Sequence, residues 1–173
     1  ECEQLIAILK AFYEINPRIT GVDYENILTQ IFERFHICVR QLRRRHSRRS
    51  TLEVTDEYDV QDLLNAILRL HFDDVRPEEW TPSYAGSNNR MDFLLKDDEI
   101  SIEAKMTRDG LKDKELGEQL IIDIAKYKEH PNCKSLYCFV FDPDGHIRNP
   151  RGLERDLTRE HDGLAVKVYI RPL

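Results

Sequence analysis

The spacing of apolar residues along the chain predicts four helices. Apolar positions recur every three to four residues over 2–15, 23–42, about 56–71 and 113–128. An aspartate stands at the start of the second and third segments, where its carboxylate can cap a helix. Each segment carries one apolar stripe, so we expect each helix to bury one face. The first two segments predict an N-terminal helical appendage.

Shorter segments with alternating or continuous apolar residues predict strands, bounded by turn-forming residues. The predicted strands are 80–84, 90–96, 100–107, 135–141 and 164–170, with a short helix near 153–158 before the last. The order of helix, three strands, helix, strand, helix and strand is typical of an α/β fold. In such a fold helices cover the faces of a mixed sheet.

The second and third predicted strands form a hairpin whose register brings two acids together. Asp97 and Asp98 form the turn, and a hairpin centred between them places Asp92 directly opposite Glu103. Side chains alternate between the two faces of a strand, so Glu103 and Lys105 share one face. Opposed side chains have Cβ atoms about 4.5–5.5 Å apart, and like charges at that distance are destabilising.

A bound cation explains why two carboxylates would be held together. Mg²⁺ binds carboxylate oxygens with water and substrate phosphate, and we expect Mn²⁺ to substitute for it. Lys105 places an ammonium group beside such an ion, where it orients an attacking water or stabilises charge on a phosphate. These are the parts needed for metal-assisted hydrolysis of a phosphodiester. An exposed hairpin face with scattered charges is the bland alternative.

Further polar residues are candidates for the same site. Gln119, Asp123 and Tyr127 recur at every fourth position of the helix over 113–128 and share one face. We expect Gln119 to reach a phosphate or a metal-bound water, and we interpret Asp123 as solvent-facing. Glu57 is an additional candidate carboxylate, although the helix dipole also favours glutamate at that position.

Two polar segments are candidate DNA-contacting regions. A glycine- and asparagine-rich segment precedes the hairpin, and an arginine-rich tract spans 40–50. The tract predicts an arm that contacts phosphates, but a solvated helix end followed by a linker explains it equally well. The candidate contacts are Ser87, Asn89, Arg90, Arg44 and Arg45.

Composition limits the function classes. The net charge of −6 argues against a non-specific nucleic-acid coat but permits a nuclease, because metal neutralises an acidic site. The four cysteines are too scattered for a zinc site. The apolar runs are too short to cross a bilayer and no secretory segment is evident, so we expect a cytoplasmic protein. The chain begins at Glu1 without an initiator methionine, and we expect a longer parent polypeptide.

The hairpin resembles the PD-(D/E)xK nuclease superfamily: Asp92 is followed by ten residues and then by Glu103-Ala104-Lys105. Longer runs are similar to DpnII/MboI-like restriction endonuclease domains. These runs are EYDVQ at 57–61, RPEEWTPSYAG at 76–86, RMDF at 90–93 and GEQLIIDI at 117–124. The resemblance covers about Thr55 to Leu173 and leaves out the N-terminal helices. Met91 stands where the superfamily's name has proline.

The resemblance implies a restriction-endonuclease-like mixed sheet flanked by helices. We expect an N-terminal helical region with the basic tract over 1–50 and a nuclease domain over 51–173. By resemblance, Asp92 and Glu103 bind Mg²⁺, Lys105 serves the water or the transition state, and Gln119 supports the site. The expected function is a Mg²⁺-dependent endonuclease that hydrolyses DNA, as the effector of a larger bacterial anti-phage defence or restriction protein. A sensor domain and further copies of the chain in a homo-oligomer are the expected partners, with no membrane association.

Two alternatives stay open. In the first, the chain is a catalytically silent module for nucleic-acid binding or oligomerisation; the intact acids and Lys105 argue against it. In the second, a nuclease acts on RNA or branched DNA, and the sequence does not separate these substrates because the chemistry at phosphorus is shared.

Overall fold

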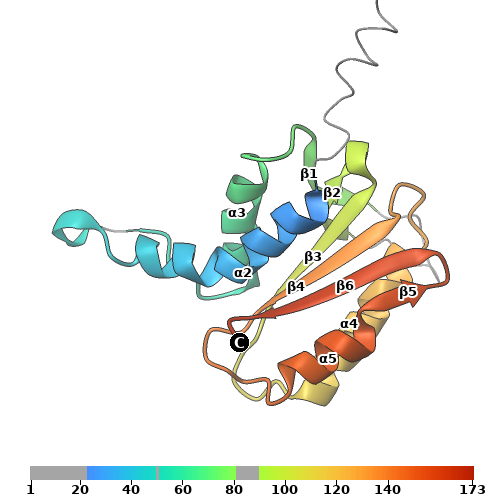
Figure 1. Cartoon of the computed structure of the whole chain (residues 1–173). Helices are drawn as coiled ribbons and strands as arrows, with labels where there is room; N and C mark the ends of the chain where they lie inside the picture. The colour runs from blue at the N-terminus through green and yellow to red at the C-terminus, as the bar shows by residue number, and fades with distance from the viewer. Residues whose placement is uncertain (1–22, 50, 81–89) are drawn as a thin grey trace, which may run out of the picture.

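The described part of the chain forms an α/β fold around one mixed sheet. The computed structural model describes residues 23–49, 51–80 and 90–173, arranged as Figure 1 shows. The helices are α2 (Tyr24–Leu42), α3 (Glu57–Leu68), α4 (Asp113–Tyr127) and α5 (Pro150–Leu157), with short 3₁₀ turns η1 (His46–Arg48) and η2 (Lys96–Asp98). The strands are β1 (Val75–Trp80), β2 (Arg90–Leu95), β3 (Ile100–Met106), β4 (Ser135–Phe141), β5 (Arg159–His161) and β6 (Leu164–Arg171).

The sheet has the mixed topology that the order of elements predicts. Its strands lie in the order β1-β2-β3-β4-β6-β5. The first three strands pair in antiparallel fashion, whereas β3, β4 and β6 run parallel, and β5 pairs antiparallel with β6. The predicted α/β fold with a mixed sheet is confirmed. The predicted helix over 2–15 lies outside the described residues.

The first strand lies earlier in the chain than the sequence predicts. A strand was expected over 80–84, but β1 occupies Val75–Trp80 and includes Pro77. Since β1 is an edge strand of the sheet, one side of its backbone needs no partner and a proline is tolerated there. Residues 81–84 lie outside the described residues.

Two helical layers enclose the sheet, each with its own apolar core. Figure 1 shows α2 and α3 on one face and α4 and α5 on the other. Phe32 and Phe35 of α2 lie with their ring centroids 4.8 Å and 5.1 Å from that of Phe139 in β4. Burying each such ring contributes about 2–3 kcal/mol. Helix α2 therefore packs directly on the sheet, while the domain boundary near residue 50 stays a prediction.

Local capping fixes where the helices begin. The side chain of Asp23 accepts a hydrogen bond from the Asn26 amide at 3.0 Å, as the pattern over 23–42 predicts. Asp56 and Asp59 form a capping box at the start of α3. This box sets the first turn of α3, and with it Glu57. Among the described residues, no helix combines the length and apolar character that a membrane span requires.

Candidate active site

The register of the β2–β3 hairpin agrees with the prediction. Leu95 pairs with Ile100 and Phe93 pairs with Ile102 around the turn η2. The backbone pairing does not extend to Asp92, the residue before Phe93. At this position the Asp92 side chain contacts β3 instead. Its Oδ2 accepts a hydrogen bond from the backbone amide of Ala104 at 2.7 Å. The carboxylate of β2 is thereby fixed against the part of β3 that carries Glu103.

A chain of ion pairs connects β3 with α4. Lys105 Nζ lies 2.9 Å from Oε1 of Glu103 and 2.8 Å from Oδ2 of Asp123. The second oxygen of Asp123 lies 2.9 Å from Lys126 Nζ, one turn further along α4. The Lys105, Glu103 and Asp123 side chains are each 14% exposed or less. Because it has two carboxylate partners, the Lys105 ammonium is held in one position.

Tyr127 joins both acidic strands from the next turn of α4. Its hydroxyl donates to Oε2 of Glu103 at 2.5 Å and accepts the backbone N–H of Asp92 at 3.1 Å. The tyrosine is buried, so both bonds are shielded from solvent. Tyr127 therefore holds Glu103 and the backbone of residue 92 at a constant separation.

The two acids of the hairpin sit in an unfavourable electrostatic environment. Burial and then the Glu103 carboxylate raise the pKa of Asp92 to about 8. Burial also raises the pKa of Glu103, and Asp123 acts in the same direction while Lys105 opposes it. A hydrogen bond from the Ala104 amide and the charge of Lys105 lower the pKa of Asp92, but only partly offset this increase. The lysine charge nearby therefore does not offset the effect of burial and of neighbouring carboxylates on these two acids.

The neighbouring carboxylates favour the charged form of Lys105. Burial on its own lowers the pKa of Lys105, but the Glu103 and Asp123 carboxylates outweigh it and raise the pKa above its ordinary value. The side chain consequently donates hydrogen bonds and stabilises negative charge.

A cavity of about 490 Å³ opens beside this cluster, between the start of α3, the end of β3 and α4. Glu57, Lys105 and Gln119 line it, and the exposed ring of Tyr58 stands at its edge. Burial raises the pKa of Glu57, while the nearby Lys105 lowers it. The structure thus brings Glu57 and Gln119 to the predicted site, with Gln119 exposed on its solvent side.

Two residues of the cluster were misjudged or missed in the sequence. The interpretation of Asp123 as solvent-facing is wrong, because Asp123 is 7% exposed and pairs with Lys105. No role was assigned to Tyr127, which bonds to Glu103. Their spacing at every fourth position with Gln119 was the available signal. It identifies a shared helix face, but not whether that face meets the sheet.

Three of the predicted DNA contacts, Arg90, Arg44 and Arg45, lie within the described residues. Arg90 is exposed, pairs with Glu78 at 2.9 Å and lies 4.7 Å above the Trp80 ring. Arg44 and Arg45 are exposed beyond the end of α2. The remaining two contacts, Ser87 and Asn89, lie outside the described residues. All of these contacts stay predictions.

The family comparison bears on this geometry. The model of the DpnII-MboI restriction endonuclease family (REase_DpnII-MboI) matches residues 26–173. The chain belongs to this family. The match begins inside α2, so it extends further toward the N-terminus than the resemblance from about Thr55; the packing of α2 on the sheet gives the physical reason. No curated protein and no solved structure is significantly similar to the chain.

Membership in the DpnII-MboI family supports the role of an endonuclease, a hydrolase acting on DNA. The fold places the candidate acids and Lys105 on the hairpin as the D-x(n)-E-x-K pattern requires. The match over residues 26–173 thus shows the family. The roles of individual residues are inferred from the local geometry.

The residues present fit a hard divalent cation. Within 23–49, 51–80 and 90–173, no three or more His, Cys, Asp or Glu side chains are grouped to hold a metal ion. Mg²⁺, however, is usually held by one or two carboxylates, with water and substrate phosphate completing its shell. The carboxylates of Asp92 and Glu103 are oxygen ligands of this kind, and burial and the Glu103 carboxylate raise the pKa of Asp92.

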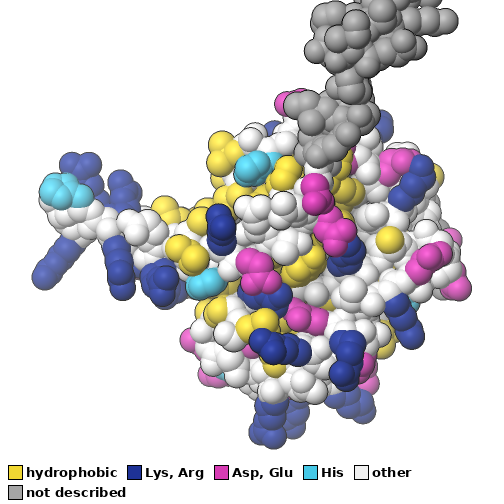
Figure 2. Space-filling view, viewed as in Figure 1, with side chains coloured by type: hydrophobic (Ala, Val, Ile, Leu, Met, Phe, Trp, Pro, Cys, Tyr) yellow, Lys and Arg dark blue, Asp and Glu magenta, His cyan; other side chains and the backbone are white. Residues whose placement is uncertain are grey.

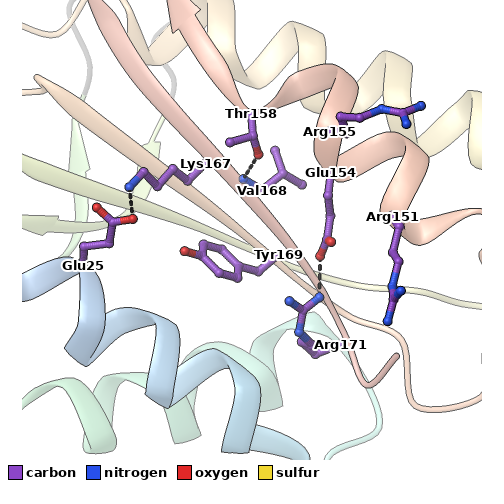
Figure 3. A pocket seen from close by; sticks show the side chains of 9 residues that line it. All are labelled: Glu25, Arg151, Glu154, Arg155, Thr158, Lys167, Val168, Tyr169 and Arg171. Atoms are coloured by element: carbon purple, nitrogen blue, oxygen red, sulfur yellow. Dashed lines mark hydrogen bonds and ion pairs between the residues drawn. The ribbon is translucent and has the colours of Figure 1, made fainter.

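A second cavity, of about 360 Å³, differs from this site in its charge balance. It lies along β6 near α2 and α5, as Figure 3 shows. Lys167 pairs with Glu25, and Arg171 pairs with Glu154. The Thr158 hydroxyl accepts a backbone N–H of β6 at 3.0 Å, where β5 no longer covers that edge. Arg151, Arg155, Lys167 and Arg171 line it with only two acids, Glu25 and Glu154, so its lining is basic. We interpret the contacts of Lys167, Arg171 and Thr158 as structural, because they tie β6 to α2 and α5 and close a strand edge.

Proposed function

We propose that this chain is a metal-dependent deoxyribonuclease that hydrolyses phosphodiester bonds of DNA. Asp92 and Glu103 hold a divalent cation, Mg²⁺ by preference, with Mn²⁺ able to replace it. When bound, the cation supplies Lewis acidity and lowers the pKa of water. The nuclease class itself rests on family membership.

One observation carries the proposal: the buried acids Asp92 and Glu103 of neighbouring strands interact, and the Lys105 ammonium that pairs with Glu103 is shared with Asp123. Burial and Glu103 raise the pKa of Asp92 to about 8. Keeping such an acid in place costs stability, since buried charges are normally paired. Binding of a cation together with the substrate would explain why the protein keeps a destabilising acid at this position.

Lys105 stabilises the negative charge that develops on the attacked phosphate. Its ammonium is held at 2.9 Å from Glu103 and 2.8 Å from Asp123, so it needs no reorganisation when the substrate arrives. Removing one such preorganised donor typically slows a reaction by about 10²–10³-fold. Asp123 and Tyr127 act by positioning, because each touches a reactive side chain and is itself buried.

Gln119 and Glu57 form the solvent side of the site. Both line the cavity beside Lys105. The Gln119 amide contacts phosphate or a water at the cation, and the Glu57 carboxylate orients water. Their neutral or negative side chains complement Lys105 and Arg108, the two basic residues that line the cavity.

The biological context of the nuclease is proposed from the resemblance to DpnII/MboI-like restriction endonuclease domains. The chain acts as the effector nuclease of a larger bacterial anti-phage defence or restriction protein, in the cytoplasm, as a homo-oligomer coupled to a sensor domain. The exposed apolar groove on α2 and α3, which includes Ile37 and Leu63, is compatible with such assembly.

Cleavage of duplex DNA by purified variants tests the proposal. Asp92→Ala, Glu103→Ala and Lys105→Ala should each lose cleavage in Mg²⁺ and Mn²⁺ while keeping the wild-type circular dichroism spectrum. The matched controls are Asp97→Asn and Lys96→Met, which alter exposed side chains at the turn of the same hairpin.

The controls should cut DNA as the wild type does. Cutting by Asp92→Ala or Lys105→Ala at the wild-type rate, or by the wild type in excess EDTA, would contradict the proposed site. Parallel incubation with single-stranded DNA and RNA shows whether the substrate is restricted to duplex DNA.

A further inference from the structure

A basic arm begins in the last turn of α2 and continues beyond its end. We define the basic arm as residues 40–49, which contain six arginines and no acidic residue. Figure 2 shows basic side chains spread over a projection from the molecule. Arg43, Arg44, Arg48 and Arg49 are all exposed. Within the described residues, these four side chains form no ion pair.

The charge of the basic arm is opposite to that of the rest of the chain. The whole chain has a net charge of −6, and the arm alone carries +6 with histidine neutral, so the remainder carries −12. A solvent-exposed surface normally carries positive and negative side chains mixed together. Separation of charge on this scale attracts a polyanion to the arm and away from the body.

The basic arm projects from the end of the sheet at which β3 and β4 terminate. Phe35 of α2 packs 5.2 Å from Phe141, at the carboxyl end of β4, and Phe141 pairs with Met106, next to Lys105. Figure 1 shows the arm projecting on the side where β3, β4 and β6 end. The arm and the cavity therefore lie at one end of the fold.

Part of the cavity lining lies a few residues after the basic arm in the sequence. Thr55, Asp56 and Glu57 follow within a few residues of the arm and line the cavity. The seven steps along the chain from Arg49 to Asp56 span at most about 25 Å when extended. Backbone phosphates of one DNA strand follow each other at about 3.4 Å along the helix axis. The arm is thus within about seven phosphate steps of the cavity.

We propose that the basic arm binds the phosphate backbone of duplex DNA beside the bond that is cut. This inference rests on the proposed function for the identity of the substrate. Arginine suits the task because its guanidinium donates two parallel hydrogen bonds to phosphate and stays charged. Contacts of this kind carry no sequence information; they set affinity and hold the duplex across the site.

Salt dependence of binding gives a quantitative test. Each phosphate neutralised by the protein contributes about 0.9 to the slope of log K against log salt concentration. The triple variant Arg44→Gln/Arg48→Gln/Arg49→Gln should therefore lower that slope by about 2–3 and weaken binding at least about ten-fold at moderate salt. The probe is a short duplex of mixed sequence, measured by fluorescence anisotropy in EDTA.

The matched control removes three charges from the opposite end of the sheet. Lys96→Gln/Lys134→Gln/Arg159→Gln alters exposed side chains at the β2–β3 turn, the start of β4 and β5. This variant should bind with the wild-type slope. Thermal unfolding of both triple variants should match the wild type, because exposed substitutions usually change stability by about 0.5 kcal/mol or less.

Cleavage separates the basic arm from the chemistry. At saturating DNA in Mg²⁺, the arm variant should cut within about three-fold of the wild-type single-turnover rate, since its arginines position and do not react. Loss of binding in the arm variant alongside a wild type that never cuts would support the arm and reject the proposed catalytic function.

Three results would overturn the inference. The first is an arm variant that binds with the wild-type affinity and salt slope. The second is a control variant that loses as much of the slope, which makes the effect one of total charge. The third is an arm variant with unchanged DNA binding but an altered mass by light scattering, which makes the arm a protein interface.

Discussion

Replacing Asp92 with asparagine is expected to stabilise the metal-free protein at alkaline pH while abolishing cleavage. The substitution keeps an oxygen that can accept the hydrogen bond from the Ala104 amide. It removes the negative charge that burial and Glu103 oppose, the two causes that raise the pKa of Asp92 to about 8. An aspartate in the unfolded chain titrates at about 3.9, so the folded protein binds this proton more tightly.

Linkage sets the sign and the size of the effect. Between about pH 4 and about pH 8, folded wild-type protein keeps a proton that the unfolded chain has lost, so its free energy of unfolding falls as the pH rises. One proton accounts for at most about 1.4 kcal/mol per pH unit, or about 4 kcal/mol from pH 5 to pH 8. Solvent reaches part of the Asp92 carboxylate, which reduces our expectation to about 2 kcal/mol.

Urea unfolding in EDTA, followed by circular dichroism, measures this effect. The stability advantage of Asp92→Asn over the wild type should grow by about 2 kcal/mol between pH 5 and pH 8. Asp97→Asn is the control, since Asp97 is exposed in the turn of the same hairpin, and it should follow the wild type. An advantage that stays constant, or that shrinks as the pH rises, would refute the account of a buried and unbalanced acid.

Three further substitutions test the supports of the site and the fold. Tyr127→Phe removes the hydroxyl that bonds to Glu103, and should destabilise the protein by about 1–3 kcal/mol in urea unfolding, because buried partners are left without a hydrogen bond. Asp123→Asn weakens the hold on Lys105, and should lower single-turnover cleavage by about 10–100-fold with little change in DNA affinity; an unchanged rate would exclude a positioning role. Phe35→Ala leaves a cavity between α2 and the sheet, and should cost about 3–5 kcal/mol; a loss below about 1 kcal/mol would show that α2 is not part of the folded core.

Local signals were enough to predict most of the elements. The capping aspartates mark the starts of α2 and α3 because each bonds to amides within the same turn. The strand pattern over 135–141 matches β4 residue for residue. The hairpin register also follows from local geometry, since the turn between Asp97 and Asp98 determines which residues oppose each other.

Features that depend on distant contacts were not accessible in the same way. The burial of Asp123 requires Lys105 to approach from β3, and no pattern within α4 reports that partner. The three residues of β5 are too few to show alternation, and their pairing depends on β6. β1 includes a proline, which only its edge position permits. In each case the deciding interaction comes from another part of the chain.

The same distinction applies to the candidate site. Asp92, Glu103 and Lys105 were predicted from alternation and register, whereas the role of Tyr127 emerges only when α4 is placed against the hairpin. A helix wheel groups Tyr127 with Gln119, yet one is buried and the other exposed. The burial of a helix face depends on how the helix is rotated over the sheet, which long-range packing decides.

Crystals soaked in Mn²⁺ offer the most direct test of the central claim, that the hairpin acids share a divalent cation. The account predicts anomalous density between Asp92 and Glu103, with oxygen ligands at about 2.1–2.2 Å. It also predicts loss of this density in Asp92→Asn. Manganese bound elsewhere, with the Glu103 carboxylate still bonded only to Lys105 and Tyr127, would contradict the claim.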